Sequence, residues 1–179
     1  MTRARSRAWI SFAALLAAAV ALSLVGGYVV AHRWDPKLQS QVQVGEWIVE
    51  DEQGVRVRVD SISRESELPS YSDANVPVPA PDGFEFVRVL ASVEVTGEPL
   101  CQFELYNGAG EQLTARSYAV IAGPASEGCT PVPDENGEKP TDFESQQVFV
   151  VLPGQELQLR VVIFQGDNPP PRYWAVEVP

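Results

Sequence analysis

The side chains best suited to nucleophilic or metal chemistry are few in this sequence of 179 residues. Cys101 and Cys129 are its only cysteines, and His32 is its only histidine. A Ser–His–Asp or Cys–His arrangement needs a basic group beside the nucleophile, and no histidine follows residue 32. Transition-metal transfer is equally short of ligands, since Met1 and His32 are the only methionine and histidine. We therefore expect a protein that is not an enzyme and that binds no cofactor.

The two cysteines are best explained as one disulfide bond. An even pair in a chain outside the cytoplasm usually forms a bridge. A bridge between Cys101 and Cys129 would contribute about 3–4 kcal/mol on a chain-entropy model. The alternative is a catalytic or metal-binding cysteine pair, and it lacks an accompanying histidine.

Carboxylates offer the remaining chemistry, because the sequence contains 24 Asp and Glu residues. One loop gathers hard oxygen donors of the kind that calcium prefers, and these are Asp134, Glu135, Asn136, Glu138, Asp142 and Glu144. Their spacing matches no EF-hand loop, and acidic residues in such loops are usually only solvated. A pair of carboxylates could also act as acid and base, so a carboxylate-based envelope hydrolase is an alternative to a non-enzymatic function.

An uncharged segment, residues 8–31, divides the chain into a basic head and an acidic body. As a helix, its 24 residues would measure roughly 36 Å, enough to cross a hydrocarbon layer of about 30 Å. Arg3, Arg5 and Arg7 precede it, which favours a cytoplasmic head (residues 1–7) and a body outside the membrane. In this interpretation residues 32–44 form a tether. The alternative is a secreted protein after cleavage of a signal peptide near Ala31, although a signal h-region is usually about 7–15 residues long.

The charge of the body limits its partners. Residues 34–179 carry nine Lys and Arg against 24 Asp and Glu, a formal charge of −15. Nucleic-acid binding is not expected, because phosphate contacts need clustered Lys and Arg. The same charge disfavours lying flat on anionic lipid. The expected contact with the membrane is therefore the N-terminal helix.

The body, residues 45–179, alternates apolar and polar residues in the way that is typical of half-buried β-strands. The runs 46–49 and 55–60 are joined by a short glycine-containing turn and predict a hairpin. Further strands are expected at 84–95, 101–107, 113–121, 147–152, 157–163 and 173–178. Two long loops, 64–83 and 122–142, lie between them. Short strands without an amphipathic helix predict an all-β fold, an antiparallel β-sandwich.

Four segments taken together resemble a known kind of domain: residues 54–62 (GVRVRVDSI), 84–89 (FEFVRV), 103–107 (FELYN) with Gly110, and 152–155 (LPGQ). In this order they resemble the immunoglobulin-like extracytoplasmic domains of unknown function in bacterial lipoproteins and membrane-anchored envelope proteins. The resemblance covers roughly residues 45–178. It implies an immunoglobulin-like sandwich outside the membrane and brings no catalytic residues. The chain departs from the pattern in two ways: it has no lipid-attachment cysteine, and Thr96-Gly97-Glu98 stands where an Asn-containing turn is usual.

A binding function would reside in the two long loops, because the strands are committed to the core. Structureless loops of more than about 12–15 residues are often functional, although a tolerated insertion is the alternative. The candidate partner surface combines Tyr71 of the first loop with Asp134, Glu135 and Glu138 of the second. We therefore expect a single-pass membrane protein whose body binds another envelope protein or polymer. A purely structural module is a further alternative.

Overall fold

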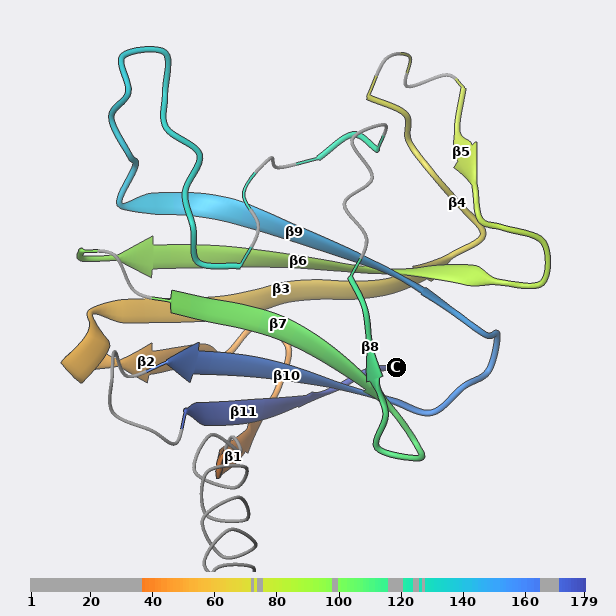
Figure 1. The fold of residues 1–179 in the computed structure, drawn as a ribbon, viewed down its shortest axis with the longest axis horizontal. Coiled ribbons are helices and arrows are strands. Elements are labelled where there is room, and N and C mark those ends of the chain that lie inside the picture. Colours follow the sequence, from red (N-terminus) through yellow and green to blue (C-terminus); the bar gives the residue numbers. More distant parts are fainter. Residues whose placement is uncertain are drawn as a thin grey trace, which may run out of the picture. The chain divides into compact units, whose positions relative to one another are not determined.

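Two β-sheets packed face to face make up the part of the chain that this computed structural model describes (Figure 1). The described residues are 37–71, 73, 76–97, 100–115, 121–123, 126, 128–164 and 171–179. The predicted membrane segment at residues 8–31 and the basic head before it lie outside them. No helix within these described ranges has the length and the apolar composition that crossing a membrane requires.

The first sheet has five strands, and its edges are formed by β1 and β8. Its order is β1 (Lys37–Val42), β11 (Arg172–Glu177), β10 (Leu157–Phe164), β7 (Leu100–Asn107) and β8 (Gln112–Leu113). Neighbouring strands are antiparallel, except that β1 and β11 run parallel.

The second sheet has four antiparallel strands, in the order β2 (Trp47–Glu50), β3 (Val55–Glu65), β6 (Glu85–Val95) and β9 (Asp142–Val151). A single 3-10 turn (Asp51–Gln53) joins β2 to β3, as the predicted hairpin requires. Gly54 closes this turn with φ +61°, and a Cβ there would lie 2.8 Å from the carbonyl oxygen of Thr96. Only glycine fits this position without displacing backbone.

The main core lies between the two sheets and follows the alternation of the sequence. Val55, Val57 and Val59 of β3 are buried, while Arg56 between them is exposed. On β10 in the opposite sheet, Leu159, Val161 and Ile163 are buried in the same way. Because successive strand residues point to opposite faces, these two apolar faces meet and exclude water. The prediction of an all-β sandwich is confirmed.

A second, smaller apolar cluster lies on the outer face of the second sheet. Phe86 and Val87 are consecutive residues of β6 and therefore point to opposite faces, yet both are fully buried. Val87 belongs to the main core, whereas Phe86 packs with Leu68, Ile121 and Val148. Leu68 comes from a short hairpin of β4 (Glu67–Leu68) and β5 (Val78–Pro79). In Figure 1 this hairpin lies above the end of the second sheet where β6 begins. The prediction of a structureless loop over residues 64–83 is therefore wrong, because burial of Leu68 folds part of it onto the sheet.

One irregularity in β3 changes which of its residues face the core. The pairing of β3 with β6 shifts register between Val59 and Ser61, so Asp60 forms a bulge. Before the bulge the odd-numbered residues point inward, and after it Ile62 and Arg64 do, opposite the buried Val89 and Val87. A bulge inserts one residue and inverts the facing of everything that follows. It therefore places an arginine on the core side of the sheet, at the end of the sandwich.

The sequence also misassigned the segment before the body. Residues 32–44 were expected to form a tether, but Lys37–Val42 is strand β1, paired with β11. Five of its six residues are exposed, and only Val42 packs against the core. The strand depends on main-chain pairing rather than on an apolar face, so its sequence has no hydrophobic alternation that would predict it. The sandwich accordingly begins near residue 37 rather than residue 45.

Two other strand boundaries differ from expectation. Of the strand predicted over residues 113–121, only Leu113 lies in a strand, β8, and Ile121 forms an isolated bridge with Ser70; residues 116–120 lie outside the described residues. Strand β9 begins at Asp142 rather than near Gln147. The polar residues at its start carry no apolar alternation, which is why the sequence assigned them to the preceding loop.

Candidate functional site

The sandwich has two chemically different ends, which strand β7 connects. Cys101 lies at the start of β7 and pairs across the sheet with Ile163, whereas Asn107 lies at its end and pairs with Leu157. We call the first the disulfide end and the second, where Arg64 lies, the arginine end. Both ends are visible in Figure 1, at the left and the right of β7.

A covalent bond fastens the disulfide end. Cys101 and Cys129 form a disulfide with Cα atoms 5.1 Å apart, and both residues are buried. The predicted pairing is confirmed. The neighbouring Gly128 adopts φ +61°, and a Cβ on it would lie 2.6 Å from the carbonyl oxygen of Cys101. The base of the following loop is therefore held tightly against β7.

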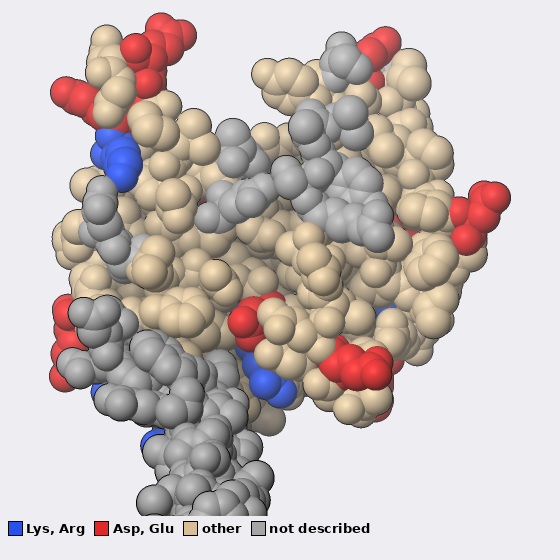
Figure 2. Space-filling view, viewed as in Figure 1, with Lys and Arg blue, Asp and Glu red and all other residues tan. Residues whose placement is uncertain are grey.

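The acidic loop, residues 128–141, rises from this base and is ordered at its tip by one carboxylate. Oδ1 of Asp134 accepts hydrogen bonds from the backbone N–H of Asn136 and of Glu138, each 2.8 Å long. These two bonds, with the Glu138 bond the stronger influence, hold the pKa of Asp134 below its ordinary value. Figure 2 shows acidic side chains gathered at this tip. The Asp134 carboxylate is thus occupied by the turn itself.

The calcium candidates do not all lie in this loop. Asp142 and Glu144 are in strand β9, where Asp142 pairs with Glu94 of β6. Asp134, Glu135, Asn136 and Glu138 remain in the turn at the tip. Within the described ranges, no group of three or more His, Cys, Asp or Glu side chains is arranged to hold a metal ion.

The predicted partner surface is split by the fold. Tyr71 is 75% exposed and lies in the connection between β4 and β5. In Figure 1 that connection and the acidic loop, which carries Asp134, Glu135 and Glu138, rise above opposite ends of β9. The two predicted loops touch where the N–H of Ala122 donates to the carbonyl oxygen of Pro69 at 2.8 Å, but the acidic tip of the second lies away from the connection that carries Tyr71.

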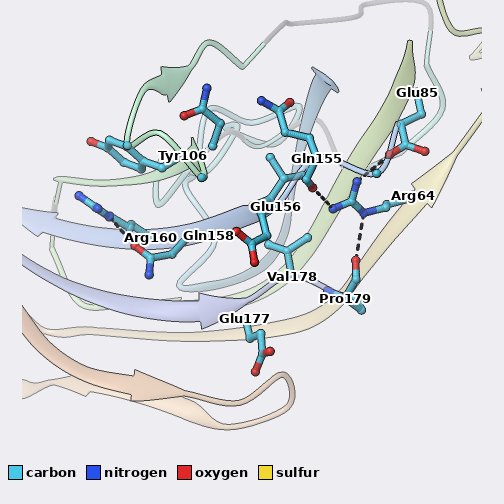
Figure 3. Close-up of a pocket in the computed structure, with 15 residues that line it drawn as sticks. Arg64, Glu85, Tyr106, Gln155, Glu156, Gln158, Arg160, Glu177, Val178 and Pro179 are labelled. Carbon is cyan, nitrogen blue, oxygen red and sulfur yellow. Dashed lines mark hydrogen bonds and ion pairs between the residues drawn. The ribbon is translucent and has the colours of Figure 1, made fainter. Parts of the chain in front are cut away.

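Arg64 fastens the arginine end by reaching three separate segments. Its Nη1 donates to Oε1 of Glu85 at 2.7 Å, forming an ion pair whose side chains are 23% and 20% exposed. Its Nη2 donates to the carbonyl oxygen of Gln155 at 2.7 Å, and its Nε donates to a Pro179 oxygen at 3.0 Å. Figure 3 shows this fan of bonds from one guanidinium. The start of β6, the β9–β10 turn and the residues after β11 are thus held together at one point.

A groove of about 790 Å³ opens next to this clamp. It runs from the clamp onto the outer face of the first sheet, along β10 and beside the β7–β8 turn (Figure 3). Glycines at that turn and at the β9–β10 turn, Gly110 and Gly154, adopt positive φ and have no atom within 4 Å of a would-be Cβ. Its principal polar lining residues are Tyr106, Gln155, Glu156, Gln158, Arg160 and Glu177.

Arg160 is held between aromatic rings on the floor of the groove. Its guanidinium carbon lies 3.8 Å from the centroid of the Tyr106 ring and 4.6 Å from that of Tyr173. Its Nε donates to Oε1 of Gln158 at 3.0 Å. The hydroxyl of Tyr106 donates to Oε2 of Glu104 at 2.9 Å. Partial burial, followed by this bond to a carboxylate, raises the pKa of Tyr106 above its ordinary value.

The sequence reasoning missed this groove entirely. The alternation predicts only a strand over residues 101–107, which contains Tyr106 and Asn107, and another over residues 157–163, which contains Arg160. Arg64 was assigned to a loop. The available signal was the set of polar or aromatic residues at most outward positions of β7 and β10, namely Gln102, Glu104, Tyr106, Gln158, Arg160 and Phe164. This signal does not say which strands are neighbours.

No known protein family and no curated protein matches this chain. Three solved structures are similar in fold. An uncharacterized β-sandwich protein from Clostridium difficile 630 is 12% identical over 79% of this chain and 95% of its own, with a TM-score of 0.46. A "putative lipoprotein" from Bacillus subtilis subsp. subtilis str. 168 is 18% identical over 76% of this chain, with a TM-score of 0.43, and the match spans 39% of that protein. A conserved hypothetical protein from Bacillus anthracis is 14% identical over 66% of this chain and 88% of its own, with a TM-score of 0.48.

Proposed function

We propose that this protein is a non-enzymatic binding domain, held outside the cytoplasm by residues 8–31, that binds another envelope component through the groove at the arginine end. The observation that carries the proposal is the groove itself. Its walls come from β7, β10, β11 and the turns beside them, and Arg64 joins the β9–β10 turn and the residues after β11 to the start of β6 through three hydrogen bonds. Ligand sites on a fixed scaffold bind more tightly because less freedom is lost on binding.

We also propose that the sandwich is of the immunoglobulin-like kind, and its topology supports this. Consecutive strands β6 and β7 lie in different sheets, as do β9 and β10, while β6 pairs with β9 and β7 with β10. These interlocked crossings are the Greek-key connection of immunoglobulin-like sandwiches.

A location outside the cytoplasm is supported by the disulfide, since such bonds persist in oxidising compartments. Arg3, Arg5 and Arg7 before the uncharged segment support an N-terminus inside the cell. Cleavage near Ala31 would place the same domain in the same compartment without its anchor.

A carboxylate-based hydrolase is the second candidate, favoured by the presence of Glu156 and Glu177 in one groove. Neither carboxylate has a hydrogen bond or an ion pair within the described part of the chain. Binding is better supported, because both side chains are exposed, and a carboxyl kept protonated as a general acid at neutral pH needs burial or a close negative neighbour.

Site-specific photo-crosslinking in the full-length protein in its native membrane tests the proposed surface. The crosslinking residue replaces Gln158 in the groove, Glu135 in the acidic loop or, as a control, the exposed Val49 of edge strand β2. We expect a product from the Gln158 position that Arg160→Ala diminishes, and none from Val49. A product from Glu135 but not from Gln158 would move the site to the predicted loop. Equal crosslinking from all three positions would mean that no surface binds specifically, and would favour a purely structural module.

A further inference from the structure

We propose that the ligand of this groove is a neutral, hydroxyl-rich polymer, that is, a stretch of uncharged polysaccharide. This inference rests on the proposed binding function and names the class of ligand. It follows from the kinds of hydrogen-bonding groups in the groove, their net charge and the openness of the site.

The groove presents donors and acceptors side by side. Arg160 supplies N–H donors only, the Gln158 amide supplies both kinds, and the carboxylates of Glu156 and Glu177 supply acceptors only. Gln158 and Glu177 are direct neighbours across β10 and β11, so their outward side chains stand together. A ligand must donate and accept within a short distance to satisfy such a set. The hydroxyl group does both with one atom, and adjacent hydroxyls of a sugar ring match planar amide, guanidinium and carboxylate groups.

The balance of charge disfavours an ionic ligand. The charge of Arg64 is already met by Glu85 and by two backbone oxygens. The remaining cation, Arg160, lies opposite Glu104 in the register of β10 and β7 and shares its groove with Glu156 and Glu177. An anionic polymer would meet these carboxylates and a body of formal charge −15. A cationic ligand would be attracted by Glu156 and Glu177 but would meet the Arg160 guanidinium beside them, whereas a neutral ligand meets no like charge anywhere in the groove.

The floor of the groove is ordered before any ligand arrives. Arg160 contacts two tyrosine rings and the Gln158 side chain at once, so its long side chain is already restricted. Ordering such a side chain on binding would otherwise cost affinity. Tyr106, which lines the groove, also adds partly exposed ring surface beside the polar groups, and the C–H faces of sugar rings pack on such surface.

The shape favours a chain over a small molecule. Sites for small ligands enclose most of the ligand surface, whereas this groove is open to solvent and lies along a sheet face and around the end of the sandwich. Glycines rather than side chains line part of its rim, at Gly108, Gly110 and Gly154. A polymer can lie along such a surface and pass beyond it at both ends.

Binding of defined oligosaccharides to the detergent-solubilised full-length protein tests this inference. The probes are cellohexaose, chitohexaose, maltohexaose, mannohexaose and xylohexaose, with oligogalacturonate as the anionic comparison, measured by isothermal titration calorimetry. We expect at least one neutral probe to bind and oligogalacturonate not to bind. Arg160→Ala and Tyr106→Ala should each weaken that binding at least about tenfold, as for central anchor residues of an interface. Glu135→Gln in the acidic loop should leave it unchanged.

A second set of variants separates recognition from folding. Arg160→Lys keeps the charge but loses the planar group, so it should also weaken binding while the melting temperature changes little. Tyr106→Phe keeps the ring and should retain most of the binding. The inference is overturned if no neutral probe binds at millimolar concentration or if the anionic probe binds best. If crosslinking from Gln158 nevertheless depends on Arg160, the binding function stands with another ligand; if that also fails, both proposals fall.

Discussion

The disulfide end and the arginine end of the sandwich are fastened by different chemistry, and each form of fastening suits what lies beside it. At the disulfide end a single covalent bond joins Cys129 to Cys101, and the acidic loop beyond it is held mainly at its base and by its own turn at its tip. At the arginine end one side chain, Arg64, holds three segments by hydrogen bonds to Glu85, Gln155 and Pro179.

The difference between the two ends bears on the proposal of a binding groove at the arginine end. A crosslink stabilises mainly by restricting the unfolded chain, and it places no direct constraint on residues 130–141 of the acidic loop, which lie outside the segment that Cys101 and Cys129 enclose. A charged clamp works only when its partners sit in fixed positions, because a partly buried guanidinium without its acceptors is costly. The clamp therefore imposes a defined geometry on the walls of the groove.

The largest effect should come from neither fastening but from the core between them. Val57→Asp and Val161→Asp each bury a carboxylate where the side chain is fully enclosed. We expect a loss of more than about 4 kcal/mol, or no folded protein, in urea denaturation. Val49→Asp, at a position 45% exposed on β2, is the matched control and should cost less than about 1 kcal/mol. Folded Val57→Asp protein with an unchanged midpoint would mean that the two fastenings, not the core, hold the sandwich.

Removal of the disulfide should have the next largest effect and should spare the groove. The double variant Cys101→Ala and Cys129→Ala avoids placing hydroxyls in buried positions and should lose about 2–4 kcal/mol. Reduction of the wild-type protein, measured in the same urea titration, should reproduce this loss. Hydrogen exchange of the Gln155 and Val178 amides should increase no more than the fall in the global free energy of unfolding accounts for. Selective loosening of those amides would show that the two ends are not independent.

Loss of the arginine clamp should lower the free energy of unfolding less than loss of the disulfide does, but it should increase local motion at the groove more. Arg64→Met keeps much of the apolar stem and removes all three hydrogen bonds, for an expected loss of about 1–3 kcal/mol. Amide exchange at Gln155 and Val178 should rise beyond the change in global stability, whereas exchange around Cys129 should not. Glu85→Gln is the control, since it keeps an acceptor for Arg64 and removes only the charge. If Arg64→Met left exchange at the groove unaltered, the clamp would not set the geometry there.

The smaller effects are opposite responses to pH, beginning with the disulfide end. The pKa of Asp134 lies below its ordinary value because backbone N–H groups bind the carboxylate. The stability that the ionised Asp134 adds to the folded state is therefore present above the ordinary aspartate pKa and is lost as the pH falls through the lower pKa of the folded state. Side-chain NMR titration should place the pKa of Asp134 below the ordinary aspartate value, and Asp134→Asn should remove this titration while keeping an acceptor for the turn. An Asp134 that titrates at the ordinary value would show that the turn is not formed in solution.

The arginine end should respond on the alkaline side. The pKa of Tyr106 is raised, so the folded state favours its neutral form. The stability that neutral Tyr106 adds to the folded state is complete below the ordinary tyrosine pKa and is lost as the pH rises through the raised pKa of the folded state. Ultraviolet titration of tyrosinate should lose a step above the ordinary tyrosine pKa in Tyr106→Phe, which keeps the ring against Arg160. An unchanged titration curve in that variant would contradict the assignment.

The sequence predicted those parts of the fold that depend on nearest-neighbour patterns. The alternation at Val55, Val57 and Val59 identified a strand and its buried face, and two cysteines in one compartment identified the disulfide. Strand β1 escaped because its sequence, KLQSQV, has no apolar face; only pairing with a distant strand makes it regular.

The candidate site could not be predicted for a related reason. A single bulge at Asp60 turns Arg64 inward, and no local pattern reveals a one-residue shift in facing. The groove then combines Arg64, Tyr106, Gln155, Arg160 and Glu177, which come from four separate stretches of chain. Their proximity depends on which strands pair, and this is a property of the whole fold.

The parallel pairing of β1 with β11 has a mechanical consequence. In register, Lys37 lies beside Arg172, which lies beside Ile163 and then Cys101, so the chain enters the sandwich at the disulfide end. If residues before β1 are fixed in a membrane and a polymer occupies the groove, tension runs lengthwise through the domain from one end to the other. The bonds between β1 and β11 lie across that line of force and share the load as a shear, rather than opening one after another as in a zipper. Strand β1, although exposed and mostly polar, would then carry the mechanical load. In a single-molecule experiment that pulls the N-terminus away from the groove, the highest force should be recorded just before β1 detaches from β11.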